Sequence, residues 1–226
     1  GLVMAAYGGA PLRWWNAAEN GALLDNMLEM LGEYDLHPKA VLWYQGEAEG
    51  FEDSAATYGD RFAAFVADVR ARLHMPALPF ITFQINRMYT PCGEDVDRQW
   101  GMVRQAQRDA MYDLPGVYTL PSLDVAMYDF IHNAASGNLV IGERAARCAL
   151  SELYGRPREW RAPEAIRAVR RAPDTVELFF ARVYNWLNCY ELPAARLPFD
   201  AEDAAGLAPV KDYTVRRDSL LLTFVR

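Results

Sequence analysis

VLWYQGEAEG, residues 41–50, is the most informative stretch of this chain. Four apolar side chains, at residues 41–44, run directly into Gln45, Gly46 and Glu47 without an intervening polar residue. A continuously apolar segment of this kind is typical of a parallel sheet that is buried on both faces. Ligands of such sheets bind beyond the carboxyl ends of the strands. The stretch therefore predicts an α/β fold with a polar rim just after its strands.

Apolar runs and helical periodicities alternate along the first two thirds of the chain. The apolar runs predict strands at 2–7, 40–44, 79–86 and 116–121. Apolar stripes at helical spacing predict helices at 23–31, 58–73, 100–110 and 138–154. Strands separated by helices favour a mainly parallel sheet that is covered on both faces.

After Gly155 the pattern changes to short β segments among Pro- and Ala-rich loops. The segments TVELFFARV and LLLTFV are the clearest of these. We therefore expect an α/β domain over residues 1–155 and a small β-rich C-terminal extension over residues 156–226.

The composition limits the classes of partner. The chain has 226 residues, a formal net charge of −7 and a pI near 5.0, and its basic residues are scattered apart from a small cluster at Arg167, Arg170 and Arg171. A protein that binds nucleic acid needs a concentrated basic face, so we expect no nucleic-acid partner. No stretch approaches the roughly 18 consecutive apolar residues of a membrane span, so we expect no membrane partner.

The three cysteines, Cys92, Cys148 and Cys189, form no close-spaced pair. An odd number of cysteines cannot all be bridged within one chain, and zinc sites need closely spaced Cys or His ligands. We therefore expect neither a disulfide framework nor a zinc site.

Polar residues gather after each predicted strand and define a strand-end rim. Its members are Gly8 and Gly9, then Gln45, Gly46 and Glu47, then Gln84 and Asn86, and finally a loop with Asp124, Asp129 and His132. Because the carboxyl ends of parallel strands lie along one edge of a sheet, we expect these four groups to converge.

Among the three histidines, His132 is the candidate general base. The motif DFIH places Asp129 three residues ahead of it. A carboxylate at this spacing can accept a hydrogen bond from one imidazole nitrogen and leave the other free as a base. The same spacing also arises where an Asp caps a helix and the His lies on the surface. His37 and His74 follow helices, where a capping role near the helix carbonyls is expected.

The ordered motifs resemble the sialate O-acetylesterase and carbohydrate acetylesterase group within the SGNH hydrolases. The resemblance covers residues 1 to about 155 and rests on GLVMAAYGGAPLRWW, AVLWYQGEAE, YGDRFAAFVADVRARL followed by LPFITFQI, MVRQAQRDA and DFIHNAASGNLVIGERAARCAL. It implies a three-layer α/β/α sandwich and the hydrolysis of acetyl esters on sugars through a covalent acyl-enzyme. It also implies an enzyme that needs no metal and no organic cofactor.

Carried over by position, the resemblance makes His132 the base, Asp129 its orienting acid, and Gln45 with Gly8 and Gly9 the groups that stabilise the oxyanion. Ester hydrolysis agrees with this assignment, because neutral donors aimed at the carbonyl oxygen stabilise the negative charge that develops there. Glycine at the turn lets the backbone approach the substrate closely.

Gly46 and Glu47 complete the substrate-binding loop of this interpretation. We expect Gly46 to allow a close backbone approach and Glu47 to brace the loop by hydrogen bonds. A plain strand-to-loop turn with Gln45 facing solvent is the alternative. Three tryptophans near these motifs are expected to lie mostly in the core rather than in a sugar-stacking wall: Trp14, Trp15 and Trp43.

The nucleophilic serine is the main departure from the family. In the family it lies in a Gly-Gln-Ser-Asn-type turn after the first strand, and this chain has no such turn. The serines present are Ser54, Ser122, Ser136, Ser151 and Ser219. Only Ser122 lies on the same loop as His132, at a position where the family has ordinary loop residues. We expect the serine to come from an upstream segment or a second chain of the same protein.

Three hypotheses of function follow. The first is a serine-type carbohydrate acetylesterase whose partners are an acetylated sugar and the serine-bearing segment. The second is a non-catalytic carbohydrate-binding pseudoenzyme. The third is a metal-dependent hydrolase with Asp129, His132 and Glu47 as ligands. With only one histidine at the rim, this ligand set is weak for zinc. The sequence leaves the compartment open, although the resemblance suggests an extracellular or periplasmic location.

Overall fold

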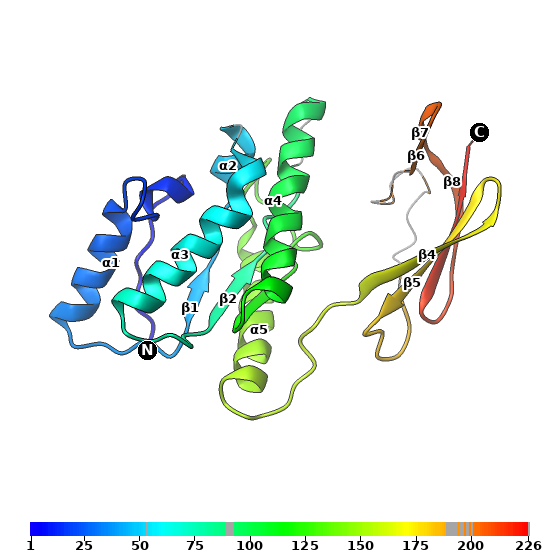
Figure 1. Ribbon diagram of the computed structural model, residues 1–226. Helices are drawn as coiled ribbons and strands as arrows, with labels where there is room; N and C mark the ends of the chain where they lie inside the picture. The colour runs from blue at the N-terminus through cyan, green and yellow to red at the C-terminus, as the bar shows by residue number, and fades with distance from the viewer. Residues whose placement is uncertain are drawn as a thin grey trace. The chain divides into compact units, whose positions relative to one another are not determined.

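The computed structural model describes residues 1–52, 54–88, 93–188, 194, 197, 199 and 201–225. The chain divides into two compact units, Gly1–Trp160 and Arg161–Arg226 (Figure 1). Trp160 belongs to the first unit because its ring packs edge-on against Tyr118, with ring centroids 5.8 Å apart, and its Nε1 donates a hydrogen bond to Glu152 at 2.8 Å. Each unit has its own sheet and its own hydrophobic core.

The first unit is built on a three-stranded parallel sheet. Its strands are β1 (Val41–Trp43), β2 (Phe80–Phe83) and β3 (Val117–Leu120), in the order β1-β2-β3. Phe80 in the central strand lies opposite Val41 on one side and Val117 on the other. The predicted mixed α/β fold with a parallel sheet is confirmed, as are the strands predicted at 40–44, 79–86 and 116–121.

Long helices lie where the apolar stripes predict them: one precedes β1, two connect the strands and one follows β3. They are α1 (Ala22–Glu33), α3 (Tyr58–Arg72), α4 (Glu94–Asp113) and α5 (Ala135–Glu152). Three short helical segments lie near the strand ends: η1 (Leu12–Trp14), α2 (Glu47–Phe51) and η2 (Ala55–Thr57).

The alternating side chains of β2 divide the core of the first unit into two clusters. Phe80 belongs to a large cluster with buried residues of α1, α3 and α4, whereas Ile81 and Phe83 belong to a second cluster with residues of α5. Successive side chains of a strand point to opposite faces of its sheet, so the two clusters lie on opposite faces of β2. Trp15 and Trp43 lie in the large cluster with ring centroids 5.2 Å apart, which confirms their predicted core role.

The strand predicted at residues 2–7 is wrong. No strand forms there, and Leu2, Met4 and Tyr7 are exposed by 80%, 75% and 61%. Figure 1 draws this segment as a plain coil. The physical reason is that a strand requires hydrogen bonds from a neighbouring strand, and within the described residues this segment pairs with none. An apolar run alone does not supply that pairing.

The second unit is an antiparallel β structure. Its four-stranded sheet has the order β4-β5-β9-β8, made of β4 (Glu164–Ala172), β5 (Thr175–Ala181), β9 (Ser219–Phe224) and β8 (Val210–Val215). A two-stranded ladder joins β6 (Ala201–Asp203) to β7 (Gly206–Ala208). Leu220, Leu222 and Phe224 of β9 form the centre of its apolar core.

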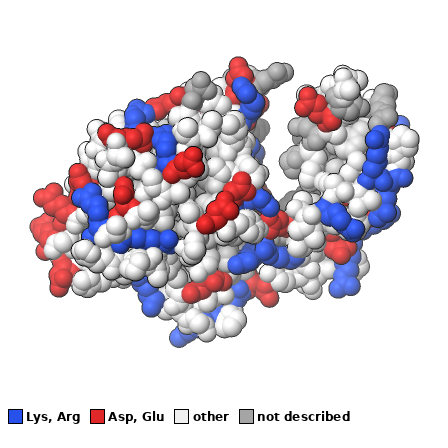
Figure 2. Space-filling view, viewed as in Figure 1, with Lys and Arg blue, Asp and Glu red and all other residues white. Residues whose placement is uncertain are grey.

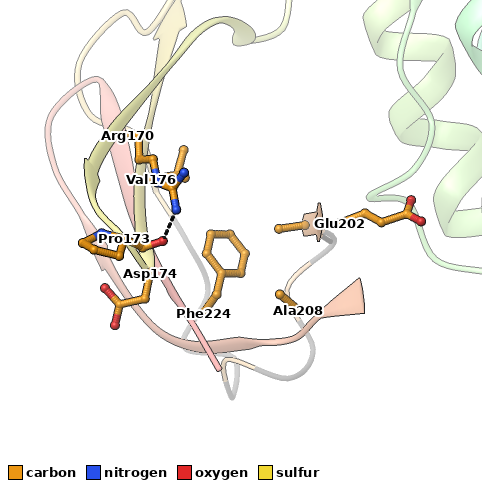
Figure 3. Close-up of a pocket in the computed structure, with 8 residues that line it drawn as sticks. Arg170, Pro173, Asp174, Val176, Glu202, Ala208 and Phe224 are labelled. Atoms are coloured by element: carbon orange, nitrogen blue, oxygen red, sulfur yellow. Dashed lines mark hydrogen bonds between the residues drawn. The ribbon is translucent and has the colours of Figure 1, made fainter. Parts of the chain in front are cut away.

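A hollow of about 180 Å³ lies in this second unit. Figure 3 shows Arg170 at its wall, donating a hydrogen bond to the Pro173 carbonyl oxygen at 2.6 Å. Phe224, which forms part of the wall, is itself 8% exposed and belongs to the core of this unit. Arg170 thus binds the backbone of the turn between β4 and β5.

Acidic and basic side chains are interspersed with uncharged areas on the face of the first unit that Figure 2 displays. Among the described residues, no helix is both long enough and apolar enough to cross a membrane.

Candidate functional site

Hairpin 127–133, between β3 and α5, holds the candidate base and its acid. Asp129 Oδ2 lies 2.7 Å from His132 Nδ1. Asp129 Oδ1 accepts backbone hydrogen bonds from Ile131 at 2.9 Å and His132 at 2.8 Å. The carboxylate therefore fixes both the turn and the ring. The His132 side chain is 69% exposed, so its Nε2 is open to a reacting group.

The hairpin is rigidly built. Met127 and Asn133 form an antiparallel bridge, and the Tyr128 N–H donates to the His132 carbonyl oxygen at 2.8 Å. Behind them the Ala134 N–H donates to Ala126 at 2.9 Å. These bonds hold the backbone of the loop, and the contact with Asp129 orients the His132 ring, as a general base needs.

Asp129 stays ionised at neutral pH. Hydrogen bonds from the backbone N–H groups of Ile131 and His132, and then the imidazole itself, lower the pKa of Asp129 to about 2. All of these donors favour the charged form of the carboxylate. The carboxylate therefore accepts the Nδ1 proton of His132 and leaves Nε2 as the basic nitrogen.

Two asparagines and a tyrosine attach the hairpin to the sheet. Asn86, after β2, donates from its side-chain amide to Asn133 Oδ1 at 2.6 Å. The Tyr44 hydroxyl, after β1, accepts hydrogen bonds from the Asn133 side chain at 3.2 Å and the Asn86 N–H at 3.3 Å. Trp100 Nε1 in turn donates to the Asn86 carbonyl at 2.6 Å. The ends of β1 and β2 and the loop after β3 thus converge, as the parallel sheet predicts.

Glu47 contributes a second carboxyl group near His132. It begins α2 and is half-buried. Burial raises the pKa of Glu47 to about 7; the charge of Glu49 also raises it, while hydrogen bonds from backbone N–H groups and the charge of His132 lower it. Glu47 is therefore partly protonated near neutral pH and lies within electrostatic reach of the base.

Gln45 faces inward rather than toward the rim. Its Nε2 donates to the Ala10 carbonyl oxygen at 3.2 Å and to Glu49 Oε2 at 2.5 Å, so both amide hydrogens are engaged. Its backbone carbonyl accepts hydrogen bonds from Gln107 at 2.8 Å and Tyr58 at 3.1 Å. Gln45 is 8% exposed, so the solvent-facing alternative for Gln45 is wrong, and its amide ties the end of β1 to the segment after Gly9.

Gly46 occupies a position that no larger residue fits. Its φ is +144°, and a Cβ there would lie 2.8 Å from both Gln107 Nε2 and Val103 Cγ1. The Gly8–Gly9 turn differs, because no atom lies within 4 Å of a Cβ at either position, and only Gly9 has a positive φ, of +70°. Gly46 is thus required for packing, whereas the turn at residues 8–9 is open.

Glu49 is a site residue that the sequence did not single out. It is fully buried, and its Oε1 accepts the Leu12 N–H at 2.5 Å. Its Oε2 accepts the Gln45 amide, and Arg61 lies 4.0 Å from Oε1. Tyr44 and Asn133 were missed in the same way. All three lie within the motifs quoted for the family resemblance, and this location could have identified them as candidates.

The remaining rim residues brace the site. Gln84 donates to the Arg104 carbonyl at 2.9 Å. Asp124 forms a two-point ion pair with Arg144, at 2.5 and 2.7 Å.

The other two histidines lie outside the rim. His74 adopts a positive φ of 55° after α3, and its N–H donates to the Ala71 carbonyl, whereas the exposed His37 pairs with Asp35 at 3.5 Å. A helix-capping contact is therefore found for His74, through its backbone.

The five serines lie elsewhere. Ser122 is buried and donates to the Gln84 carbonyl at 2.6 Å. Ser219 donates to Glu177 at 2.8 Å in the second unit. Ser136 and Ser151 lie in α5, and Ser54 precedes η2 with a buried hydroxyl. In the described part of the chain, no serine hydroxyl forms a hydrogen bond with His132.

The described residues contain no group of three or more His, Cys, Asp and Glu side chains that could hold a metal ion. The set of Glu47, Asp129 and His132 does not form such a group, so the metal-dependent hydrolase is not supported by the described residues. Cys148 is buried, and Cys92 and Cys189 lie outside the described residues.

Comparisons with known proteins identify the family of the first unit. A family profile described as carbohydrate esterase, sialic acid-specific acetylesterase, matches residues 1–151. A probable carbohydrate esterase from Arabidopsis thaliana is 33% identical over 89 residues, which cover 38% of this chain and 34% of the plant protein.

Two solved structures share the fold. A carbohydrate acetylesterase from Xanthomonas citri superimposes with a TM-score of 0.79 at 23% identity, covering 98% of this chain and 53% of that protein. A crystal structure of an Arabidopsis thaliana protein gives a TM-score of 0.56 at 25% identity, covering 66% of this chain and 60% of that protein. The chain thus spans about half the length of the bacterial relative. With two thirds of its residues matched by the family profile, the chain belongs to the sialic acid-specific acetylesterase family of carbohydrate esterases.

Proposed function

We propose that this chain is the histidine–aspartate part of a carbohydrate O-acetylesterase, a serine-type carboxylic ester hydrolase with an SGNH-like three-layer α/β/α fold. The observation that carries the proposal is the Asp129–His132 pair, 2.7 Å apart on a rigid hairpin at the ends of parallel strands. Membership of a carbohydrate esterase family supports the class of reaction.

In the proposed reaction, His132 Nε2 removes the proton of a serine hydroxyl as the serine oxygen attacks the acetyl carbonyl. The resulting imidazolium is stabilised by the ionised Asp129. The ester C–O bond then breaks, the sugar oxygen takes the proton from Nε2, and the acetyl group stays on the serine. A water molecule, deprotonated by the same nitrogen, releases acetate and restores the serine.

The Gly8–Gly9 turn supplies the oxyanion donors of this proposal from the present chain. No atom lies within 4 Å of a Cβ placed at either glycine, so this side of the turn leaves room for an ester. Gln45 takes part through its amide contact with the Ala10 carbonyl, which holds the end of the turn against β1. Direct contact of the Gln45 amide with the oxyanion would require Nε2 to leave Ala10 and Glu49.

A further segment or chain of the same protein supplies the serine in this proposal. β1 is an edge strand among the described residues, and Leu42 in it is 52% exposed. An uncovered edge with an exposed apolar side chain is suited to pairing with another strand. A strand added there would end at the same rim as β1, so a turn that follows it could place a serine beside His132.

Intact mass spectrometry under denaturing conditions, combined with a p-nitrophenyl acetate assay with and without a fluorophosphonate probe, tests the proposal. We expect hydrolysis to be lost as one serine is labelled, with the label on a segment that differs from residues 1–226. Labelling of Ser122, or hydrolysis that survives complete labelling, would contradict the proposed source of the nucleophile.

A non-catalytic carbohydrate-binding pseudoenzyme is the second candidate, favoured because no serine hydroxyl of the described residues forms a hydrogen bond with His132. It predicts sugar binding with no acetate release and no probe labelling in the complete protein. Acetate release that depends on a probe-labelled serine would exclude it.

A further inference from the structure

Two aromatic side chains on hairpin 127–133 have no role in the reaction described so far. Tyr128 is 83% exposed and Phe130 is 48% exposed. They flank Asp129 on either side in the sequence, and neither belongs to a hydrophobic cluster of the described residues. Large aromatic rings gain from burial, so two of them held in solvent on a rigid loop indicate a surface that is covered when a ligand binds.

The geometry of the hairpin places Tyr128 beside the base. Met127 and Asn133 form the bridge, and the next residues inward, Tyr128 and His132, are joined by the hydrogen bond from the Tyr128 N–H to the His132 carbonyl. Residues opposite one another in an antiparallel pair project their side chains to the same side, about 5 Å apart at Cβ. The backbones of Tyr128 and His132 thus lie opposite one another at the base of the loop.

We propose that Tyr128 and Phe130 form a platform for the sugar ring of the substrate. The C–H face of a pyranose is apolar, and tyrosine offers it a rigid, amphipathic surface that loses little conformational entropy on binding. A ring resting on Tyr128 carries its O-acetyl group toward His132, and such positioning lowers the barrier of the reaction. This inference rests on the proposed function and names its substrate class.

The charges around the hairpin favour a neutral sugar over an acidic one. Asp129 is ionised, and Glu47 titrates near neutral pH. The arginine groups that contact the preceding loop are engaged: Arg87 donates to the carbonyl oxygens of Leu123 and Val125, and Arg144 pairs with Asp124. Arg87 keeps its positive charge, but the ionised Asp129 stands between the two aromatic residues in the sequence, so we expect the platform to favour neutral O-acetylated pyranosides.

Binding to the chain itself tests the platform, because binding does not require the serine. The probes are an O-acetylated xylo-oligosaccharide and an O-acetylated sialic acid, titrated by isothermal calorimetry. We expect the neutral probe to bind more tightly and Tyr128→Ala or Phe130→Ala to weaken its binding by about tenfold. Tyr34→Ala is the matched control, because Tyr34 is 64% exposed at the end of α1 and its loss should leave binding unchanged.

Equal affinity of Tyr128→Ala and Tyr34→Ala for the neutral probe would overturn the platform, as would absence of binding to the wild-type chain. Tighter binding of the acidic probe would overturn the neutral-sugar preference. Acetate release by the complete protein, measured separately, distinguishes the two proposals. Tyr128-dependent binding without acetate release in the complete protein would support the platform and overturn the esterase. Acetate release with the same KM in wild type and Tyr128→Ala would support the esterase and overturn the platform.

Discussion

Glu49→Ala should be among the most destabilising single substitutions near the site. The carboxylate is fully buried and accepts hydrogen bonds from the Leu12 N–H and the Gln45 amide, both at 2.5 Å. Its removal leaves two buried donors without that acceptor, at about 1–3 kcal/mol each. Arg61 keeps its ion pair with Glu19 at 2.9 Å, so little is added from that side. Removing the carboxylate also removes the cost of its own desolvation, which offsets part of this loss. We therefore expect the free energy of unfolding to fall by about 3 kcal/mol.

Thermal unfolding followed by circular dichroism measures this loss. At about 2–4 °C per kcal/mol for a chain of this size, Tm should fall by about 6–12 °C. Glu52→Ala is the matched control: Glu52 follows the same short helix, but its ion pair with Arg13 joins two half-exposed side chains, so Tm should barely change. Equal Tm values for the two variants would refute the argument that Glu49 clamps the end of β1 to the segment at Leu12.

Three further predictions concern the rim. Gly46→Ala should lower the free energy of unfolding by about 1–3 kcal/mol in urea denaturation, because its Cβ would lie 2.8 Å from Gln107 Nε2. Gly8→Ala, with open space around it, should change the free energy of unfolding by less than about 0.5 kcal/mol. A larger loss in Gly8→Ala than in Gly46→Ala would contradict this packing argument. Glu47 has a folded-state pKa of about 7, above its ordinary 4.5, so the folded chain binds more protons between these values and stability should fall by up to about 3 kcal/mol as pH rises from about 4.5 to about 7. Denaturation midpoints across this range should lose that slope in Glu47→Gln, and an unchanged slope would show that Glu47 is not its source. Asp129→Asn keeps an acceptor for the backbone N–H groups but favours the wrong His132 tautomer. The kcat for acetate release should therefore fall by roughly 10³–10⁴-fold with little change in Tm. A kcat near that of the wild type would contradict the proposed role of Asp129.

The strands and helices of the first unit could be predicted because their signals are local. Continuous apolar runs such as residues 79–86 become buried parallel strands, and the apolar stripe of α3 packs against them. The same kind of run at residues 2–7 does not form a strand, since pairing depends on a neighbour that the local pattern does not reveal.

The candidate site was predictable to the extent that its contacts are short-range. Asp129 and His132 are three residues apart, and their hydrogen bond follows from that spacing. The inward turn of Gln45 depends on Ala10 and on Glu49, and the clamp at Glu49 depends on Leu12, 37 residues away. Contacts between distant segments of this kind leave no periodic signal in the sequence.

The most direct test of the central claim compares wild type with His132→Ala. Acetate release from an O-acetylated xylo-oligosaccharide is measured for the chain joined to the proposed serine-bearing segment. The account predicts steady release by the wild type and no detectable release by the variant, with equal Tm because the His132 side chain is 69% exposed. Release by His132→Ala at the wild-type rate would contradict the account.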